Sequence, residues 1–224
     1  MARSRTVMCW SSGKDSAFAL HALRQGGAHD VVALLTSLNE DAGRVSMHGV
    51  RDALLDAQAA ALGLPCVKVR LPADCPNQVY EARMGEACRA LLADGVTHMA
   101  FGDLYLEDVR AYRERMLAPV GLAPVFPIWG LPTAVLARHM VRAGIGARLS
   151  CIDTRRLPEA FAGRAFDAAL LDDFPPGIDP CGENGEFHTF CHAAPGFTAP
   201  IAVRAGDRHR AGDFLFTDIL PAAL

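Results

Sequence analysis

The stretch SSGKDS, residues 11–16, combines three hydroxyl groups, one lysine and one aspartate around a glycine. Glycine lets the backbone approach a ligand closely, and serine hydroxyls can donate hydrogen bonds to phosphate oxygens. A lysine adds a positive point charge to such a site. The spacing is neither G-x-x-x-x-G-K-[ST] nor G-x-G-x-x-G. The stretch is therefore either a phosphate-binding loop or a serine-capped helix start with a solvated lysine. The candidate phosphate-binding residues are Ser11, Ser12, Gly13, Lys14, Asp15 and Ser16.

The elements around this stretch favour the ligand-binding alternative. Apolar runs predict strands at 6–10, 30–36, 66–71 and 97–101, and helical patterns occupy 16–25, 47–62, 77–93 and 106–116. Alternating strands and helices with apolar strands predict a parallel sheet covered on both faces. Ligands bind such sheets at the carboxyl ends of strands, where helix N-termini favour anions. Residues 11–16 follow the first predicted strand directly.

The alternation ends near residue 120. Residues 120–132 (VGLAPVFPIWGLP) are broken by prolines, 133–143 are predicted as a helix, 147–152 as a strand, and the remainder as loop-rich. We predict a domain boundary near 125–130. An α/β domain would then occupy residues 1–127, followed by a smaller α+β domain over residues 128–224.

The composition excludes several classes of protein. A net charge of −3 argues against nucleic acid as a partner bound through bulk electrostatics. The sequence contains no run of 18 apolar residues, so we expect no membrane span. The N-terminus lacks the apolar core of a signal peptide. The seven cysteines include no C-x-x-C pair. They favour buried reduced thiols in a cytoplasmic protein over disulfides or a metal site.

Four further stretches fall where the same site would need them: LLTSLNE (34–40), SMHGVR (46–51), FGDLYLEDVRAYRE (101–114) and DPCGENGEFHTF (179–190). The stretch at 46–51 would form the start of the second predicted helix. Asp103 follows Gly102 at a strand end, which suits a metal ligand, whereas Asp15 either caps its helix or binds the same metal. His48 is either structural or a nucleotide contact.

Charged residues in the third and fourth stretches have ordinary explanations as well. Arg110 and Glu114 are four residues apart, which is typical of a surface ion pair, although Arg110 or Arg113 could instead contact a substrate carboxylate or phosphate. Between residues 172 and 188 there are five acidic residues and no lysine or arginine, the pattern of a solvated acidic loop. The glycines at 182 and 185, among Glu183, Glu186 and His188, also suit a tight loop that binds a cation or an amine.

The hexad resembles the S-G-G-x-D-S loop of the PP-loop ATP pyrophosphatases, with Ser12 in place of the first glycine. Together with the four further stretches, it is similar to the diphthine–ammonia ligase family, in particular its short bacterial-type members, over residues 5–200. The resemblance implies an adenine nucleotide alpha hydrolase-like fold (Rossmann-like, HUP-type). It also implies ATP, Mg²⁺, a carboxylate substrate and ammonia, with an amide, AMP and pyrophosphate as products.

This chemistry assigns roles to the candidate residues. Lys14 and the loop N–H groups would stabilise charge that develops on the α-phosphate. Asp15 and Asp103 would hold Mg²⁺. Glu183 or Glu186 would capture ammonium, and one of them or His188 would take its proton before the attack on an acyl-adenylate. The remaining nucleotide-binding candidates are Thr36, His48 and Gly102.

The acceptor is a small-molecule or protein carboxylate, and a homo-oligomer is an open alternative to a monomer. Two other functions compete with the ligase. A PP-loop RNA-modifying enzyme is disfavoured by the missing C-x-x-C and the acidic balance. A regulatory module that binds nucleotide without catalysis would leave the 179–190 stretch without a purpose.

Overall fold

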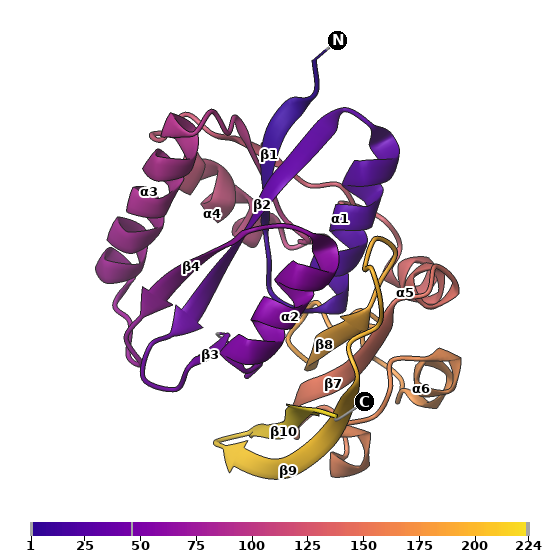
Figure 1. Ribbon diagram of the computed structural model, residues 1–224. Helices are drawn as coiled ribbons and strands as arrows, with labels where there is room; N and C mark the ends of the chain where they lie inside the picture. The colour runs from indigo at the N-terminus through magenta and orange to yellow at the C-terminus, as the bar shows by residue number, and fades with distance from the viewer. Residues whose placement is uncertain (1, 46, 223–224) are drawn as a thin grey trace.

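A mostly parallel first sheet carries the N-terminal half of the chain (Figure 1). The computed structural model describes residues 2–45 and 47–222. In that part of the chain the sheet has the strands β1 (Ser4–Cys9), β2 (His29–Asn39), β3 (Arg44–Val45), β4 (Cys66–Leu71), β5 (His98–Ala100) and β6 (Ala123–Val125). The parallel strands are ordered β4-β2-β1-β5-β6, and β3 pairs antiparallel with β2. Strands are added first on one side of β1 and then on the other, so the carboxyl ends of β1 and β5 form the topological switch point.

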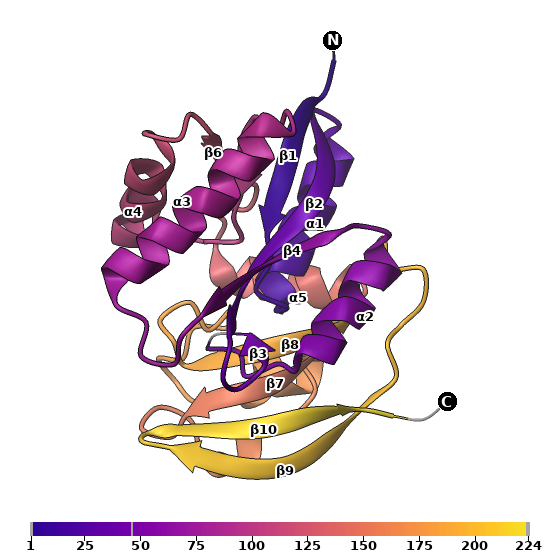
Figure 2. The same ribbon diagram turned by 60° about the vertical axis from the view of Figure 1, so that its left-hand side comes forward.

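Helices cover both faces of the first sheet. Figures 1 and 2 show α1 and α2 on one side and α3 and α4 on the other. Their bounds are α1 (Lys14–Gly26), α2 (Asp52–Leu62), α3 (Asn77–Ala93) and α4 (Glu107–Leu117). Neighbouring residues of β1 point to opposite faces: Val7 packs in the core beneath α3, and Met8 in the core beneath α1. Burial on both faces explains why the central parts of β1 and β2 are apolar runs.

The C-terminal half forms a second sheet that is antiparallel. Its strand order is β8-β7-β10-β9 (Figure 2). It shares one hydrophobic core with α1 and α2. The elements of this half are α5 (Thr133–Arg142), β7 (Gly146–Asp153), η1 (Glu159–Phe161), α6 (Ala168–Asp173), β8 (Phe187–Ala193), β9 (Val203–Ala211) and β10 (Phe214–Pro221). No helix in the described residues is long and apolar enough to span a membrane.

Two sequence expectations about elements are wrong. The helix expected over 47–62 begins only at Asp52, because Met47 and Gly49 have φ of 60° and 65°, which an α-helix does not allow. Residue 46 lies outside the described residues. The region after 152 is not loop-rich throughout, since it holds β8, β9 and β10. β9 is largely exposed and therefore lacks the apolar run by which the first-sheet strands were recognised.

Candidate functional site

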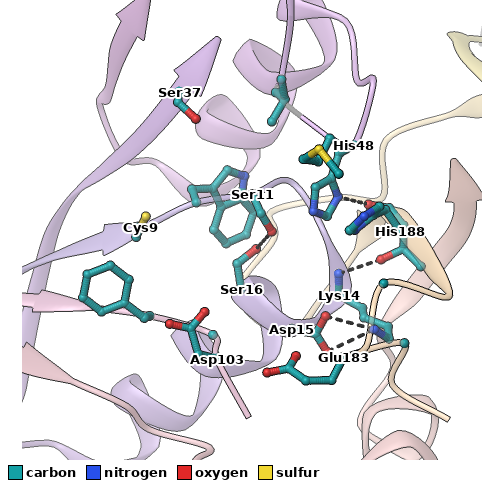
Figure 3. Close-up of a pocket in the computed structure, with 18 of the residues that line it drawn as sticks. Cys9, Ser11, Lys14, Asp15, Ser16, Ser37, His48, Asp103, Glu183 and His188 are labelled. Carbon is teal, nitrogen blue, oxygen red and sulfur yellow. Dashed lines mark hydrogen bonds and ion pairs between the residues drawn. The ribbon is translucent and has the colours of Figure 1, made fainter. Parts of the chain in front are cut away.

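A cavity of about 370 Å³ opens at the carboxyl ends of β1 and β5, between the two sheets (Figure 3). Segments that are far apart in the sequence meet there: the loop after β1, the turn before α2, the loop after β5 and the loop before β8. The sequence-predicted residues that line it are Ser11, Lys14, Asp15, Ser16, His48, Gly102, Asp103, Glu183 and His188. The switch point of the first sheet thus coincides with the cavity, as expected for an open parallel sheet.

The backbone of the SSGKDS loop adopts a conformation that favours glycine. Ser12 has a φ of 69°, the left-handed region, and its side chain is buried. Its carbonyl accepts hydrogen bonds from the Gln58 side chain (3.1 Å) and from the Cys191 backbone N–H (2.8 Å). The loop is therefore fixed from α2 and from β8, and these contacts hold a serine where the related loops have a glycine.

Gly13 and Gly102 are both required by close packing around the first turn of α1. A Cβ on Gly13 would lie 2.7 Å from Cε1 of His48, and one on Gly102 would lie 2.9 Å from the backbone nitrogen of Ser16. The Lys14 N–H donates to Oγ1 of Thr189 at 3.1 Å, and the Ser11 hydroxyl donates to that of Ser16 at 3.2 Å. Hydroxyl groups and a helix N-terminus thus converge on the cavity, a set that suits an anion.

Lys14 is buried rather than solvated, with an exposed fraction of 2%. Its Nζ donates to Asp15 at 2.9 and 3.1 Å and to the Cys181 carbonyl, and it lies 5.1 Å from the centre of the Phe187 ring. Burial disfavours the ammonium, but the Asp15 carboxylate outweighs it and raises the pKa of Lys14. The cavity therefore contains a permanent positive charge that is shielded from water.

Three carboxylates lie on the side of the cavity beneath Lys14: Asp15, Asp103 and Glu183 (Figure 3). The Glu183 carboxylate accepts a hydrogen bond from the backbone N–H of Leu104 at 2.8 Å. Burial, reinforced by the nearby charges of Asp15 and Asp103, raises the pKa of Glu183 to about 7. Burial also raises the pKa of Asp103, against the opposing effect of Arg113. A carboxyl group that titrates near neutral pH can act as an acid or a base there.

His48 and His188 lie side by side at the opposite wall, with ring centres 4.8 Å apart (Figure 3). Nδ1 of His48 is 2.8 Å from the carbonyl oxygen of Thr189, so Nδ1 carries the proton. Burial lowers the pKa of His48. Burial and the neighbouring His48 and Lys14 lower the pKa of His188 to about 3. His188 is therefore neutral at ordinary pH and a poor proton acceptor.

Besides Gly13, whose packing against His48 is described above, three predicted site residues do not line the cavity. Glu186 is fully buried, pairs with Arg156 at 3.1 Å and accepts from the Asp179 backbone N–H at 3.2 Å. Thr36 is buried and donates to the Trp10 carbonyl at 2.8 Å. The third, Ser12, acts through its backbone as described above. All three stabilise the loops and strands around the cavity.

Two further residues line the cavity. The sequence analysis left Arg113 only as an alternative substrate contact and did not mention Tyr80. Arg113 lies 3.4 Å from Asp103 and over the ring of Phe101, and Tyr80 of α3 lines the same wall. Arg110, three residues earlier, instead forms the expected surface pair with Glu114 at 2.8 Å. The two arginines differ only in the direction in which their side chains leave α4: Arg113 points into the cavity and Arg110 does not. No sequence signal marked Tyr80.

Asp179 organises the loop before β8. Its carboxylate accepts hydrogen bonds from the backbone N–H groups of Cys181 (3.0 Å) and Glu183 (3.2 Å), and from the Tyr105 hydroxyl (3.0 Å). Gly182 has a φ of 71°, and a Cβ there would lie 2.8 Å from the Phe187 carbonyl oxygen. This turn directs Glu183 toward the cavity. The unused sequence signal was Asp179 itself, a turn-forming residue three positions before Gly182 and six before Gly185.

Two family models match the chain. The diphthamide synthase N-terminal domain matches residues 4–124, and the diphthamide synthase C-terminal domain matches residues 133–223. A comparison with curated proteins finds no match. The two matched regions span most of the sequence, and both supply residues to the cavity. The chain therefore belongs to the diphthamide synthase family, also called the diphthine–ammonia ligase family.

Proposed function

We propose that the protein is an AMP-forming carboxylate–ammonia ligase that activates its acceptor as an acyl-adenylate. Membership of the diphthamide synthase family indicates an ATP-using ligase of the PP-loop type. The observation that carries the finer proposal is the meeting of a buried ammonium, Lys14, with Glu183 in one cavity. One group suits a reaction at phosphate, and the other suits proton transfer to or from an amine.

The loop after β1 provides the residues for the first step, the adenylation of the acceptor carboxylate. A carboxylate oxygen of the acceptor attacks the α-phosphorus of ATP, the bond to the bridging oxygen breaks, and pyrophosphate leaves. Lys14 and the Ser11 and Ser16 hydroxyls stabilise the negative charge on the phosphate oxygens. Because Lys14 is held in a buried position before ATP binds, little reorganisation is needed during the reaction.

Asp15 and Asp103 are the residues that would hold Mg²⁺. Among the described residues, no group of three or more His, Cys, Asp or Glu side chains forms a metal site. Mg²⁺ bound with a nucleotide usually takes only one or two protein carboxylates and completes its shell with phosphate oxygens and water. Two carboxylates beside the phosphate loop fit that requirement. The ion would neutralise the charge of the departing pyrophosphate.

Glu183 provides the base for the second step, the attack of ammonia on the acyl-adenylate. Ammonia enters as ammonium, which must lose a proton before nitrogen attacks the acyl carbon and AMP leaves. Glu183 lines the cavity, whereas Glu186 is occupied by Arg156 and His188 is too weak a base. Of the three candidates, Glu183 is therefore the proposed acceptor of the proton.

Arg113 is the proposed anchor for the acceptor carboxylate. Replacing Arg113 with glutamine should raise the KM for that carboxylate about 10- to 100-fold, since a hydrogen-bonded charge contact is lost. Steady-state kinetics at saturating ATP measure the effect. Arg110→Gln on the same helix is the control, because Arg110 pairs with Glu114 outside the cavity. An equal rise in both variants would contradict the assignment.

Product analysis tests the proposal as a whole. The protein is incubated with ATP, Mg²⁺, ammonium and a panel of carboxylic acids that includes a peptide containing diphthine. AMP, pyrophosphate and an amide in equal amounts support the ligase. ADP and phosphate would contradict it, and nucleotide bound without turnover on any acid would favour a regulatory module.

A further inference from the structure

Asp218 of β10 lies outside the cavity, yet it receives two arginines from the segment that carries His48. Nη1 of Arg44 is 2.9 Å from one carboxylate oxygen, and Nε of Arg51 is 3.0 and 3.2 Å from the two oxygens. Nη2 of Arg51 also donates to Asp218. The carboxylate side chain is 13% exposed, so solvent screens this cluster less than a surface pair. A bidentate contact of this kind fixes orientation as well as distance.

The two arginines flank the turn that contains His48. Arg44 and Arg51 face each other in an antiparallel bridge, and the Val45 N–H donates to the Val50 carbonyl at 2.8 Å. Nη1 of Arg44 also donates to the carbonyl of Gly49 at 2.6 Å. One carboxylate therefore holds both ends of this turn, here called the His48 turn and defined as residues 47–50.

A second contact from the same strand supports the His48 turn. Phe216 lies two residues before Asp218 and thus on the same face of β10. A Cβ on Gly49 would lie 3.0 Å from Cδ1 of Phe216, and Gly49 has a φ of 65°. The aromatic ring therefore packs directly against the backbone of the turn. Phe216 thus packs on the His48 turn at Gly49, whereas the ion pairs to Asp218 hold the turn at Arg44 and Arg51.

The His48 turn in turn borders the phosphate-binding loop. The His48 ring packs against Gly13, and its Nδ1 donates to Thr189 in β8. Met47, which is 60% exposed, lines the cavity beside His48. A shift of the turn by an ångström or two would move one wall of the cavity relative to the SSGKDS loop.

We propose that Asp218 is a positioning residue for the nucleotide-binding site, which it shapes by holding His48 against Gly13 through Arg44 and Arg51. The last strand of the second sheet thereby controls nucleotide affinity without touching the nucleotide. This inference rests on the proposed function only in that the cavity takes ATP. The two arginines hold the pKa of Asp218 at about 2, against the effect of burial, so the carboxylate stays ionised.

The test compares Asp218→Asn with Asp213→Asn in the full-length protein. Asp213 lies in the turn just before β10 and pairs with Arg155 at 3.2 Å, away from the His48 turn. Both variants replace an arginine-paired aspartate with asparagine, so they match in chemistry and charge. Titration calorimetry with ATP and Mg²⁺ should show a Kd about tenfold higher for Asp218→Asn alone. Without nucleotide, its Gly49 amide should exchange hydrogen faster than in the wild type. Asp218→Glu, which keeps a carboxylate, should restore part of the affinity.

The outcomes separate this inference from the proposed function. Wild-type affinity and wild-type Gly49 exchange in Asp218→Asn would overturn the positioning role, as would equal weakening by Asp213→Asn. A thermal midpoint lowered without a change in either readout would assign Asp218 to stability alone. A wild-type protein that binds no ATP contradicts the proposed function, and amide exchange then still decides whether Asp218 holds the turn.

Discussion

Lys14→Met should reduce pyrophosphate release by about 10²–10³-fold, because the fixed charge beside the α-phosphate is lost. Methionine is unbranched and apolar and can occupy the same buried space, so the fold should persist. Asp15 loses its partner, but its side chain is 24% exposed and can be solvated. The measurement is pyrophosphate release with ATP, Mg²⁺, ammonium and the carboxylate identified by product analysis.

The chain offers a matched control for this variant. The sequence has one other lysine, Lys68, whose Nζ pairs with Asp52 and Asp56 away from the cavity. Lys68→Met removes the same charge and should keep the rate within a few-fold of the wild type. A Lys14→Met protein that is folded and still releases pyrophosphate at the wild-type rate would remove Lys14 from the reaction.

Glu183→Gln should abolish the ammonia-dependent step and change its pH profile. The pKa of Glu183 is about 7, so the wild-type rate should rise with pH through that value as the carboxylate forms. Glutamine can still accept the Leu104 hydrogen bond, but it cannot take a proton. The rise near pH 7 should therefore disappear in the variant. Amide formation followed from pH 5.5 to 9 at a fixed concentration of ammonium ion, the species that enters the site, measures both effects.

Glu183 should also make the folding stability of the wild-type protein fall as the pH rises, whereas its rate rises. The pKa of Glu183 is raised from its ordinary value of 4.5 by folding, so the native state binds this proton more tightly than the unfolded chain. That favourable contribution is complete below pH 4.5 and is lost as the pH rises through about 7. Relative to the wild type, Glu183→Gln should therefore gain thermal stability on going from pH 5 to pH 8. A variant that keeps the wild-type pH–rate profile would contradict the role of Glu183. Loss of the step in Glu186→Gln instead would assign the base to Glu186.

The first sheet could be predicted because its strands and helices have local signals. The bounds of β4 and α3 are as expected, since prolines or a glycine interrupt the pattern near their ends and β4 is rich in β-branched and apolar residues. The second sheet could not be predicted in the same way. β9 is stabilised by its pairing with β10 and is mostly exposed, so its sequence resembles a loop.

The candidate site could be predicted as a set of segments but not residue by residue. Glu183 and Glu186 are the same residue type three positions apart in one loop, yet one lines the cavity and the other pairs with Arg156. Arg110 and Arg113 diverge in the same way on α4. Which member of each pair faces the cavity depends on how distant segments pack, and that information is not local to either motif.

The hydrogen bond from Lys14 to Thr189 joins residues 175 positions apart, and Cys191 binds the carbonyl of Ser12 across a similar span. During synthesis the SSGKDS loop leaves the ribosome before its partners in β8, which lie more than 170 residues further along the chain. Contacts of such long range are made late, because closing a long loop is entropically unfavourable until much of the chain is ordered. The phosphate loop is therefore synthesised before its partners and acquires its final contacts only after β8 has formed. Acquisition of nucleotide binding would mark the end of folding rather than its beginning.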